Sequence, residues 1–198
     1  MTQLIFATGN AGKMREIRQI MADMPLEIKS MKEAGVEADI IEDGKTFEEN
    51  ALIKARAIQA LAGGIVLADD SGLEVDYMNK MPGIYSARFM GEDTSYDIKN
   101  KAIIDALEKA DGEARSARFV CAIAAVLPDG SERVVRATME GRIGYEIAGA
   151  NGFGYDPIFF LPEYGKTSAE LSSEEKNAIS HRGKALRLMK EELKEALS

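Results

Sequence analysis

The 198-residue chain has no tryptophan and contains only one cysteine, one histidine and five prolines. The lone Cys121 cannot form an internal disulfide, and one cysteine with one histidine cannot build a structural zinc cluster. Sparse cysteine is typical of a reducing compartment, so we expect a cytoplasmic protein. No apolar run approaches the roughly 18 residues of a membrane span, and the first residues lack the pattern of a signal peptide, so we expect no membrane partner.

Positive charge is also in deficit, with 25 Lys and Arg against 33 Asp and Glu and a formal net charge of −8. An acidic chain has no overall field that attracts a phosphate backbone, so we expect no nucleic-acid partner. Apolar residues make up 45% and charged residues 29%, which is ordinary for a globular domain and unlike a disordered chain. The length, without repeats or linkers, predicts a single domain over residues 1–198.

Strand and helix patterns alternate along the chain. Apolar runs predict buried strands at residues 3–7, 65–68, 117–127 and 158–161, and residues 132–143 return antiparallel after a Pro-Asp-Gly turn. Periodic apolar residues and capping signals predict helices at 14–24, from Thr46 to Gly63, at 96–110, and after Ser172, the last with Leu186, Met189, Leu193 and Leu197 on one stripe. Strands that alternate with helices, together with one long hairpin, predict an α/β fold with a mixed, partly antiparallel sheet covered by helices.

A glycine-containing loop, TGNAGK at residues 8–13, separates a predicted strand from a predicted helix. Backbone N–H groups at the start of a helix bind anions, and Lys13 adds a positive charge. The loop is not a P-loop, because its glycines are three residues apart and Met14 stands where Ser or Thr would bind Mg²⁺. Phosphate binding and a plain tight turn are both compatible with this segment.

Two adjacent acids, Asp69 and Asp70, follow the predicted strand at 65–68 and precede Ser71. Successive side chains on a strand point to opposite faces, so we expect the two carboxylates to have different roles. Buried acids need a partner or a cation, and oxygen ligands suit Mg²⁺. Glu42 could supply a second carboxylate for such a metal. For the segment around Asp69 and Asp70, and for the one around Glu42, the alternative is a solvated turn.

Two further segments carry residues suited to binding. Residues 153–157 place Phe153 and Tyr155 between glycines, where aromatic rings could stack on a base or fill the core. Residues 176–183 contain Lys176, the only histidine His181, and Arg182. Such hydrogen-bond donors recognise carbonyl oxygens and phosphates, although a solvated basic face is the alternative.

Six segments in this order resemble the inosine/xanthosine triphosphate pyrophosphatase family, the Ham1-like enzymes that remove non-standard purine nucleotides. They are TGNAGK at 8–13, TFEENALIKA at 46–55, ADDSGLEVD at 68–76, PGIYSARF at 82–89, GFGYDPIFF at 152–160 and SHRGKAL at 180–186. The resemblance implies hydrolysis between the α and β phosphates, which releases the monophosphate and pyrophosphate. It also implies Mg²⁺, a homodimer, a preference for ITP, dITP and XTP over ATP and GTP, and two lobes with the site in a cleft between them.

The resemblance implies roles for individual residues as well. The triphosphate would be held by Thr8, Gly9, Asn10, Ala11, Gly12, Lys13 and Lys54. Glu42 and Asp70 would be the metal ligands, with Asp70 also the proton acceptor and Ser71 beside it. The nucleoside pocket would contain Phe153, Gly154, Tyr155 and Asp156, and the base would contact Lys176, His181 and Arg182.

Other function classes stay open. A catalytically silent nucleotide-binding module would keep the glycine loop and the aromatic pocket, but it would not need Glu42, Asp69 and Asp70. A related pyrophosphatase could act on pyrimidine triphosphates, although the pair His181 and Arg182 belongs to the purine-type pattern. A protein-interaction domain would need a large exposed apolar patch.

Overall fold

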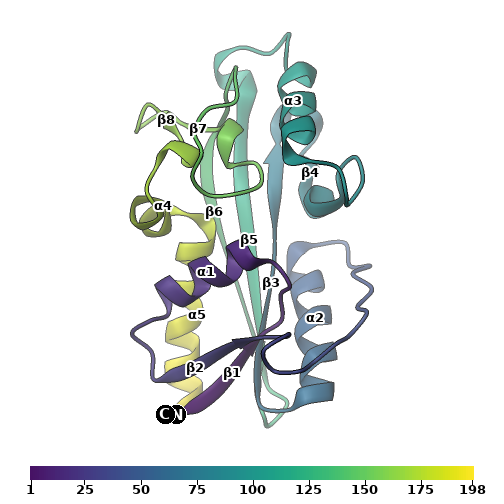
Figure 1. The fold of residues 1–198 in the computed structure, drawn as a ribbon, viewed down its shortest axis with the longest axis vertical. Helices are drawn as coiled ribbons and strands as arrows, with labels where there is room; N and C mark the ends of the chain where they lie inside the picture. The colour runs from purple at the N-terminus through teal and green to yellow at the C-terminus, as the bar shows by residue number, and fades with distance from the viewer. The chain divides into compact units, whose positions relative to one another are not determined.

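The computed structural model describes all 198 residues, which form a mixed α/β fold (Figure 1). The chain divides into two compact units: unit 1 comprises residues 1–70, 121–137 and 182–198, and unit 2 comprises residues 71–120 and 138–181. Three long strands contribute to both units, namely β3 (Ile65–Val75), β5 (Ser116–Val126) and β6 (Glu132–Ile143). The predicted mixed sheet covered by helices is therefore confirmed.

The other strands are β1 (Thr2–Phe6), β2 (Leu26–Ser30), β4 (Met81–Pro82), β7 (Phe159–Leu161) and β8 (Lys166–Thr167). In unit 1 the strand order is β2-β1-β3-β5-β6, and β1 pairs in parallel with both β2 and β3. In unit 2 the order β3-β5-β6 continues through β7 to β8, with β4 paired to β3. The β3–β4, β6–β7 and β7–β8 pairs are antiparallel, so both strand arrangements occur in the sheet.

The α-helices are α1 (Ala11–Ile20), α2 (Phe47–Ala62), α3 (Tyr96–Ala106), α4 (Ser173–Ile179) and α5 (His181–Leu197). Thr46 caps α2 by accepting a hydrogen bond from the backbone N–H of Glu49, and Ser172 begins a complete capping box at α4. These residues satisfy backbone groups that have no partner inside the helix. None of the helices has the length and apolar character that crossing a bilayer requires.

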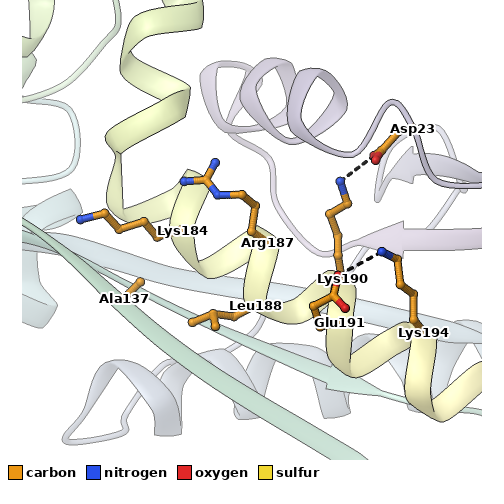
Figure 2. Close-up of a pocket in the computed structure, with 8 residues that line it drawn as sticks. All are labelled: Asp23, Ala137, Lys184, Arg187, Leu188, Lys190, Glu191 and Lys194. Carbon is orange, nitrogen blue, oxygen red and sulfur yellow. Dashed lines mark hydrogen bonds and ion pairs between the residues drawn. The ribbon is translucent and has the colours of Figure 1, made fainter.

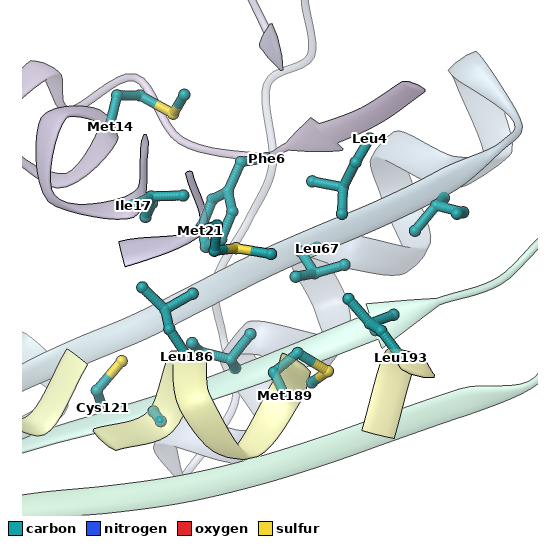
Figure 3. Packing of buried hydrophobic residues seen from close by; sticks show 14 of the residues in the cluster. Leu4, Phe6, Met14, Ile17, Met21, Leu67, Cys121, Leu186, Met189 and Leu193 are labelled. Carbon is teal, nitrogen blue, oxygen red and sulfur yellow. The ribbon is translucent and has the colours of Figure 1, made fainter. Parts of the chain in front are cut away.

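Unit 1 has its own apolar core, formed where α1 and α5 pack on one face of β1, β3 and β5 (Figure 3). Phe6, Ile17 and Met189 are fully buried within it. The predicted stripe on α5 is buried at Leu186, Met189 and Leu193, whereas Leu197, the last residue of the helix, is 48% exposed. The core fixes α1 and α5 against the sheet, so charged residues on their inner faces are held in place.

Unit 2 has a second apolar core, which includes Leu73 of β3, Ile103 of α3 and Phe159 of β7. Tyr155 belongs to this cluster and is 5% exposed. Its hydroxyl donates a hydrogen bond to the backbone oxygen of Ser86 at 2.5 Å. Tyr155 therefore fills the core, which the sequence left open as one of two alternatives.

Several predicted boundaries were wrong. Helix α1 begins at Ala11 instead of residue 14, because the side chain of Asn10 caps it by accepting a hydrogen bond from the N–H of Lys13, and it ends at Ile20 instead of residue 24. Helix α3 ends at Ala106, four residues early. Strand β3 runs on to Val75, so Asp69 and Asp70 lie within the strand and not after its end.

Candidate functional site

The loop after β1 places Lys13 in the first turn of α1. The hydroxyl of Thr8 accepts a hydrogen bond from the N–H of Asn10 at 3.1 Å, and Gly9 lies between these two residues. Ala11, Gly12 and Lys13 then form the first turn of the helix. The positive end of the helix and the Lys13 ammonium are thus held together, which is an arrangement that attracts phosphate.

Asp69 lies on the face of β3 that α1 and α5 cover, and only 1% of its surface is exposed. Its Oδ2 atom is 3.2 Å from Nζ of Lys13 on α1 and 3.5 Å from Nη2 of Arg182 on α5. Nη1 of Arg182 lies 2.5 Å from Oε2 of Glu16, one helical turn after Lys13. Two buried carboxylates and two cations therefore compensate one another.

Asp70 projects from the opposite face of β3, toward α2. Nζ of Lys54 on α2 is 3.7 Å from Oδ1 of Asp70 and 2.9 Å from Oε1 of Glu42. Asp69 and Asp70 therefore have different partners, as the alternation along a strand predicts. The structure brings Glu42 and Asp70 together around the ammonium of Lys54.

The second oxygen of Asp70 suits a metal ion. Oδ2 of Asp70 is buried and has no hydrogen-bond partner. A buried unpaired oxygen is costly, and a cation can satisfy it. No group of three or more His, Cys, Asp or Glu side chains is arranged so that it could hold a metal ion. One or two carboxylates are enough for Mg²⁺, which keeps several waters and binds substrate phosphates, so Glu42 and Asp70 fit this ion.

The pKa values of Asp69 and Asp70 are shifted in opposite directions by burial and by neighbouring charges. Burial raises the pKa of Asp70 to about 6, although Lys54 and Lys13 oppose the shift. Burial would also raise the pKa of Asp69, but Lys13 and Arg182 outweigh it and hold that pKa well below its usual range. At neutral pH both groups are ionised, and only Asp70 titrates near the pH at which a general base is useful.

The raised pKa of Asp70 predicts a stability change that depends on pH. Between pH 3.8 and about 6 the folded state binds more protons at Asp70 than the unfolded state, so this group lowers the unfolding free energy as the pH rises. Asp70→Asn should therefore stabilise the metal-free protein at pH 8, by about 3 kcal/mol at most. Urea unfolding in the presence of a chelator measures this gain. Variant and wild type should converge toward pH 4, and a gain that is equal at pH 4 and 8 would contradict the assignment.

The second group of predicted residues lies in unit 2 around Asp156, which is 2% exposed. Asp156 accepts hydrogen bonds from Nζ of Lys176 at 2.6 Å, from the N–H of Phe153 at 3.0 Å and from the hydroxyl of Ser168 at 2.7 Å. Nζ of Lys176 also lies 4.8 Å from the centre of the Phe153 ring. The structure thus brings Phe153, Asp156 and Lys176 together in one cluster.

Three other predicted residues of unit 2 have different surroundings. The His181 ring stacks on Phe119, with 4.8 Å between ring centres, and His181 is 4% exposed. The backbone oxygen of Gly154 accepts a hydrogen bond from Asn100 at 3.1 Å. Ser71 follows Asp70 along β3 and is partly buried. Their roles toward a substrate stay predictions.

Arg182 is the residue whose surroundings differ most from the expected ones. It is 2% exposed, and its guanidinium contacts Glu16 and Asp69 in unit 1. Glu16 was not among the site residues predicted from the sequence. A signal for it did exist, because Glu16 and Lys13 are three residues apart and therefore share one face of a helix.

Unit 1 also has an open pocket beside α5, which none of these residues lines (Figure 2). Leu188 and Ala137 line it together with basic side chains. Lys190 pairs with Asp23 at 2.6 Å, and Lys194 pairs with Glu191 at 3.0 Å. None of the residues predicted to bind substrate or metal lines this pocket, so it is not the candidate site.

Known proteins resemble the chain over almost its full length. A dITP/XTP pyrophosphatase of Clostridium perfringens is 48% identical over 200 residues, which covers 98% of each chain. A dITP/XTP pyrophosphatase of Caldanaerobacter subterraneus is 50% identical over 192 residues, which covers 96% of each chain.

Solved structures agree with the sequence comparison. The HAM1 protein of Coxiella burnetii matches with a TM-score of 0.88 at 40% identity, covering 98% of this chain and 100% of that one. A nucleoside-triphosphatase / dITP/XTP pyrophosphatase of Mycobacterium abscessus matches with a TM-score of 0.75 at 40% identity, covering 94% and 98%. The family model described as the Ham1 family matches residues 4–192. With this coverage and these identities, the chain belongs to the Ham1 family.

Proposed function

We propose that the chain hydrolyses the non-standard purine nucleoside triphosphates ITP, dITP and XTP to the monophosphate and pyrophosphate. The observation that carries this proposal is Asp70, a buried strand carboxylate with one unpaired oxygen, next to Glu42 and Lys54. A buried acid beside a second carboxylate and a lysine suits a reaction on a metal-bound polyphosphate. The relatives named dITP/XTP pyrophosphatases support the same chemistry.

The triphosphate is proposed to bind at the start of α1, where residues 8–12 form the turn and the first helical residues, and Lys13 supplies a charge. Lys54 is a second phosphate ligand in this proposal. Its ammonium lies between Glu42 and Asp70. Burial would lower the pKa of Lys54, but Asp69, Asp70 and Glu42 together raise it, so this lysine keeps its charge. A charged lysine here can offset phosphate charge that develops at the bond being broken.

A divalent metal belongs to this proposal, with Mg²⁺ as the specific ion. Glu42 and Asp70 would hold it. When bound, Mg²⁺ neutralises phosphate charge and lowers the pKa of a bound water. Asp70, ionised above pH 6, can accept the proton of the attacking water, with Ser71 next to it in β3.

The purine base is proposed to bind at the cluster of Phe153, Asp156 and Lys176, with Gly154, Tyr155, His181 and Arg182 as the remaining members of the predicted pocket. Lys176 carries only donors, and His181 can present an N–H. Donors that face position 6 of the base bond the oxygen of inosine or xanthosine and oppose the amino group of adenosine. Leaving a buried donor unpaired costs about 1–3 kcal/mol, which disfavours ATP.

Several wider features are also part of the proposal. Residues 1–198 form one domain, because β3, β5 and β6 contribute to both units. The active form is a homodimer in the cytoplasm, without a nucleic-acid or membrane partner. The net charge of −8 supports the absence of a nucleic-acid partner. The lone, buried Cys121 supports a reducing compartment such as the cytoplasm.

Lys13→Ala should weaken the binding of triphosphates much more than the binding of monophosphates. The ammonium of Lys13 lies at the start of α1, where the β and γ phosphates are proposed to bind. Losing one charge-assisted contact costs about 1.5–3 kcal/mol, so the Kd for an ITP analogue should rise at least about tenfold. Calorimetric titration with α,β-imido-ITP and with IMP gives both constants. Equal weakening of the two ligands would refute the phosphate assignment.

A panel of nucleoside triphosphates with Mg²⁺ tests the proposed function. We expect monophosphate and pyrophosphate from ITP, dITP and XTP, with much lower kcat/KM for ATP and GTP. A preference for pyrimidine triphosphates would identify the related pyrimidine-type activity instead. Binding of ITP without any product would identify a silent nucleotide-binding module.

A further inference from the structure

Glu42, one of the two proposed metal ligands, lies in a segment that has no secondary structure of its own. Residues 36–44 form neither a helix nor a strand, whereas Asp70, the other proposed ligand, lies within β3. The position of Asp70 is therefore fixed by the sheet. The position of Glu42 has to be fixed by contacts from outside its own segment, and α2 supplies such contacts.

The chain folds back along α2 as it leaves Glu42. The ammonium of Lys54 lies 2.9 Å from Oε1 of Glu42. One turn earlier on α2, Oδ1 of Asn50 accepts a hydrogen bond from the backbone N–H of Gly44 at 2.9 Å. Asn50 and Lys54 are four residues apart, so they are neighbours on the helix surface. The first contact holds the carboxylate of Glu42, and the second holds the backbone two residues further along the chain.

Asn50 is unusual for its place in α2. It is 1% exposed and lies with Ala51 and Ala55 among the buried residues of the helix. A buried amide is costly without a hydrogen bond, and asparagine is a poorer helix former than the alanines beside it. The bond with Gly44 offsets this cost. The use of an amide at this position is thereby tied to the segment that carries Glu42.

Gly44 brings the backbone of this segment directly against α2. A Cβ atom on Gly44 would lie 2.7 Å from Oδ1 of Asn50 and 2.8 Å from Cβ of Glu49, and both distances are too short for a real contact. The next backbone N–H, that of Lys45, donates a hydrogen bond to Oε2 of Glu49 at 2.6 Å. Any side chain at Gly44 would therefore push the segment away from Asn50.

We propose that Asn50 is a positioning residue for the metal site: its side-chain oxygen holds the segment before α2, so that Glu42 stays close to Asp70. The inference rests on the proposed function, because Glu42 and Asp70 are assigned to a divalent metal there. Without this hydrogen bond the segment is held less firmly on α2, and part of its ordering is left to the moment at which the ion binds. That ordering costs free energy, so the ion binds more weakly.

Asn50→Leu tests this, because it removes the acceptor oxygen and keeps a side chain of similar size. We expect the Kd for Mn²⁺, a paramagnetic substitute for Mg²⁺, to rise about tenfold in the nucleotide-free protein, since residues that orient metal ligands contribute about 10–100-fold to metal affinity. Titration with MnCl₂, followed through the electron paramagnetic resonance of free Mn²⁺, measures this constant. In a Glu42→Gln background the same change should have almost no further effect.

Gly44→Ala is a second, independent variant, because its methyl group breaks the same contact and leaves Asn50 in place. It should raise the Kd for Mn²⁺ by a similar factor, and it replaces Asn50→Leu in the cycle if circular dichroism shows that Asn50→Leu is unfolded. The matched control is Asn100→Leu, which removes an asparagine of α3 that is also 1% exposed and also bonds to the backbone, but in unit 2. It should leave the Kd for Mn²⁺ unchanged.

Four results would overturn the inference: an unchanged Kd for Mn²⁺ in folded Asn50→Leu or Gly44→Ala, an equal rise in Asn100→Leu, an undiminished effect in the Glu42→Gln background, or a wild type that binds no Mn²⁺ at millimolar concentrations. These results leave the proposed function intact if the wild type releases pyrophosphate from ITP in the presence of Mg²⁺. A wild type that releases none refutes the proposed function itself.

Discussion

Asp70→Asn should lower kcat for ITP hydrolysis by about a hundredfold or more, since a positioned general base contributes about 10²–10⁴-fold. The amide keeps the shape of the side chain but can neither accept the proton of the attacking water nor carry the charge that suits Mg²⁺. Asp70 is buried, its pKa is raised to about 6, and its Oδ2 has no partner in the protein. Steady-state assays at pH 8 with Mg²⁺ measure the loss.

Asp43→Asn is the control for this variant, because Asp43 is an exposed carboxylate next to Glu42. It should keep nearly the full kcat. Asp69→Asn is a poorer control, since it would leave the buried Arg182 and Lys13 without their shared carboxylate. If Asp70→Asn retains more than about a tenth of the wild-type kcat, a loss below 1.4 kcal/mol, then Asp70 is not the central acid.

Arg182→Ala should lower the unfolding free energy by about 3–5 kcal/mol. Arg182 is 2% exposed and pairs with Glu16 and Asp69, so its removal leaves two buried carboxylates without their guanidinium. Breaking a buried ion pair by removing one partner exposes the full cost of burying the other. Urea unfolding at neutral pH, followed by circular dichroism, measures this loss.

Arg136→Ala is the comparison for the stability prediction. Arg136 pairs with Glu48 at 3.1 Å, but both side chains are substantially exposed, at 41% and 31%. Exposed pairs contribute less than about 1 kcal/mol. Similar losses for the two variants would mean that the buried network does not stabilise unit 1.

Local patterns in the sequence were sufficient to predict most of the strands and helices of the fold. The short apolar runs became β1, β5 and β7, and the capping signals at Thr46 and Ser172 marked the starts of α2 and α4. Alternation along a strand also separated Asp69 from Asp70 correctly. These features depend on residues close together in the chain, so they can be read without knowing the tertiary contacts.

The continuation of β3 through Asp69 and Asp70 could not be read in this way. Asp, Ser and Gly are typical of turns, so the sequence predicts that the strand ends before them. Their place inside a buried strand depends on cations that come from three different helices, namely Lys13, Lys54 and Arg182.

Glu16 illustrates the same limit within the candidate site. A glutamate in an amphipathic helix is normally read as facing solvent. Its burial depends on Arg182, which is 166 residues away in the sequence. Sequence spacing placed Glu16 on the same helix face as Lys13, but only the tertiary structure shows that this face meets α5.

The position of bond cleavage tests the central claim most directly. Hydrolysis of ITP in ¹⁸O-labelled water, with Mg²⁺ and mass spectrometry of both products, identifies the phosphorus atom that water attacks. For attack at the α phosphorus with pyrophosphate as the leaving group, the label should appear in IMP and the pyrophosphate should carry none. Label in pyrophosphate, or IDP and inorganic phosphate as the products, would contradict the account.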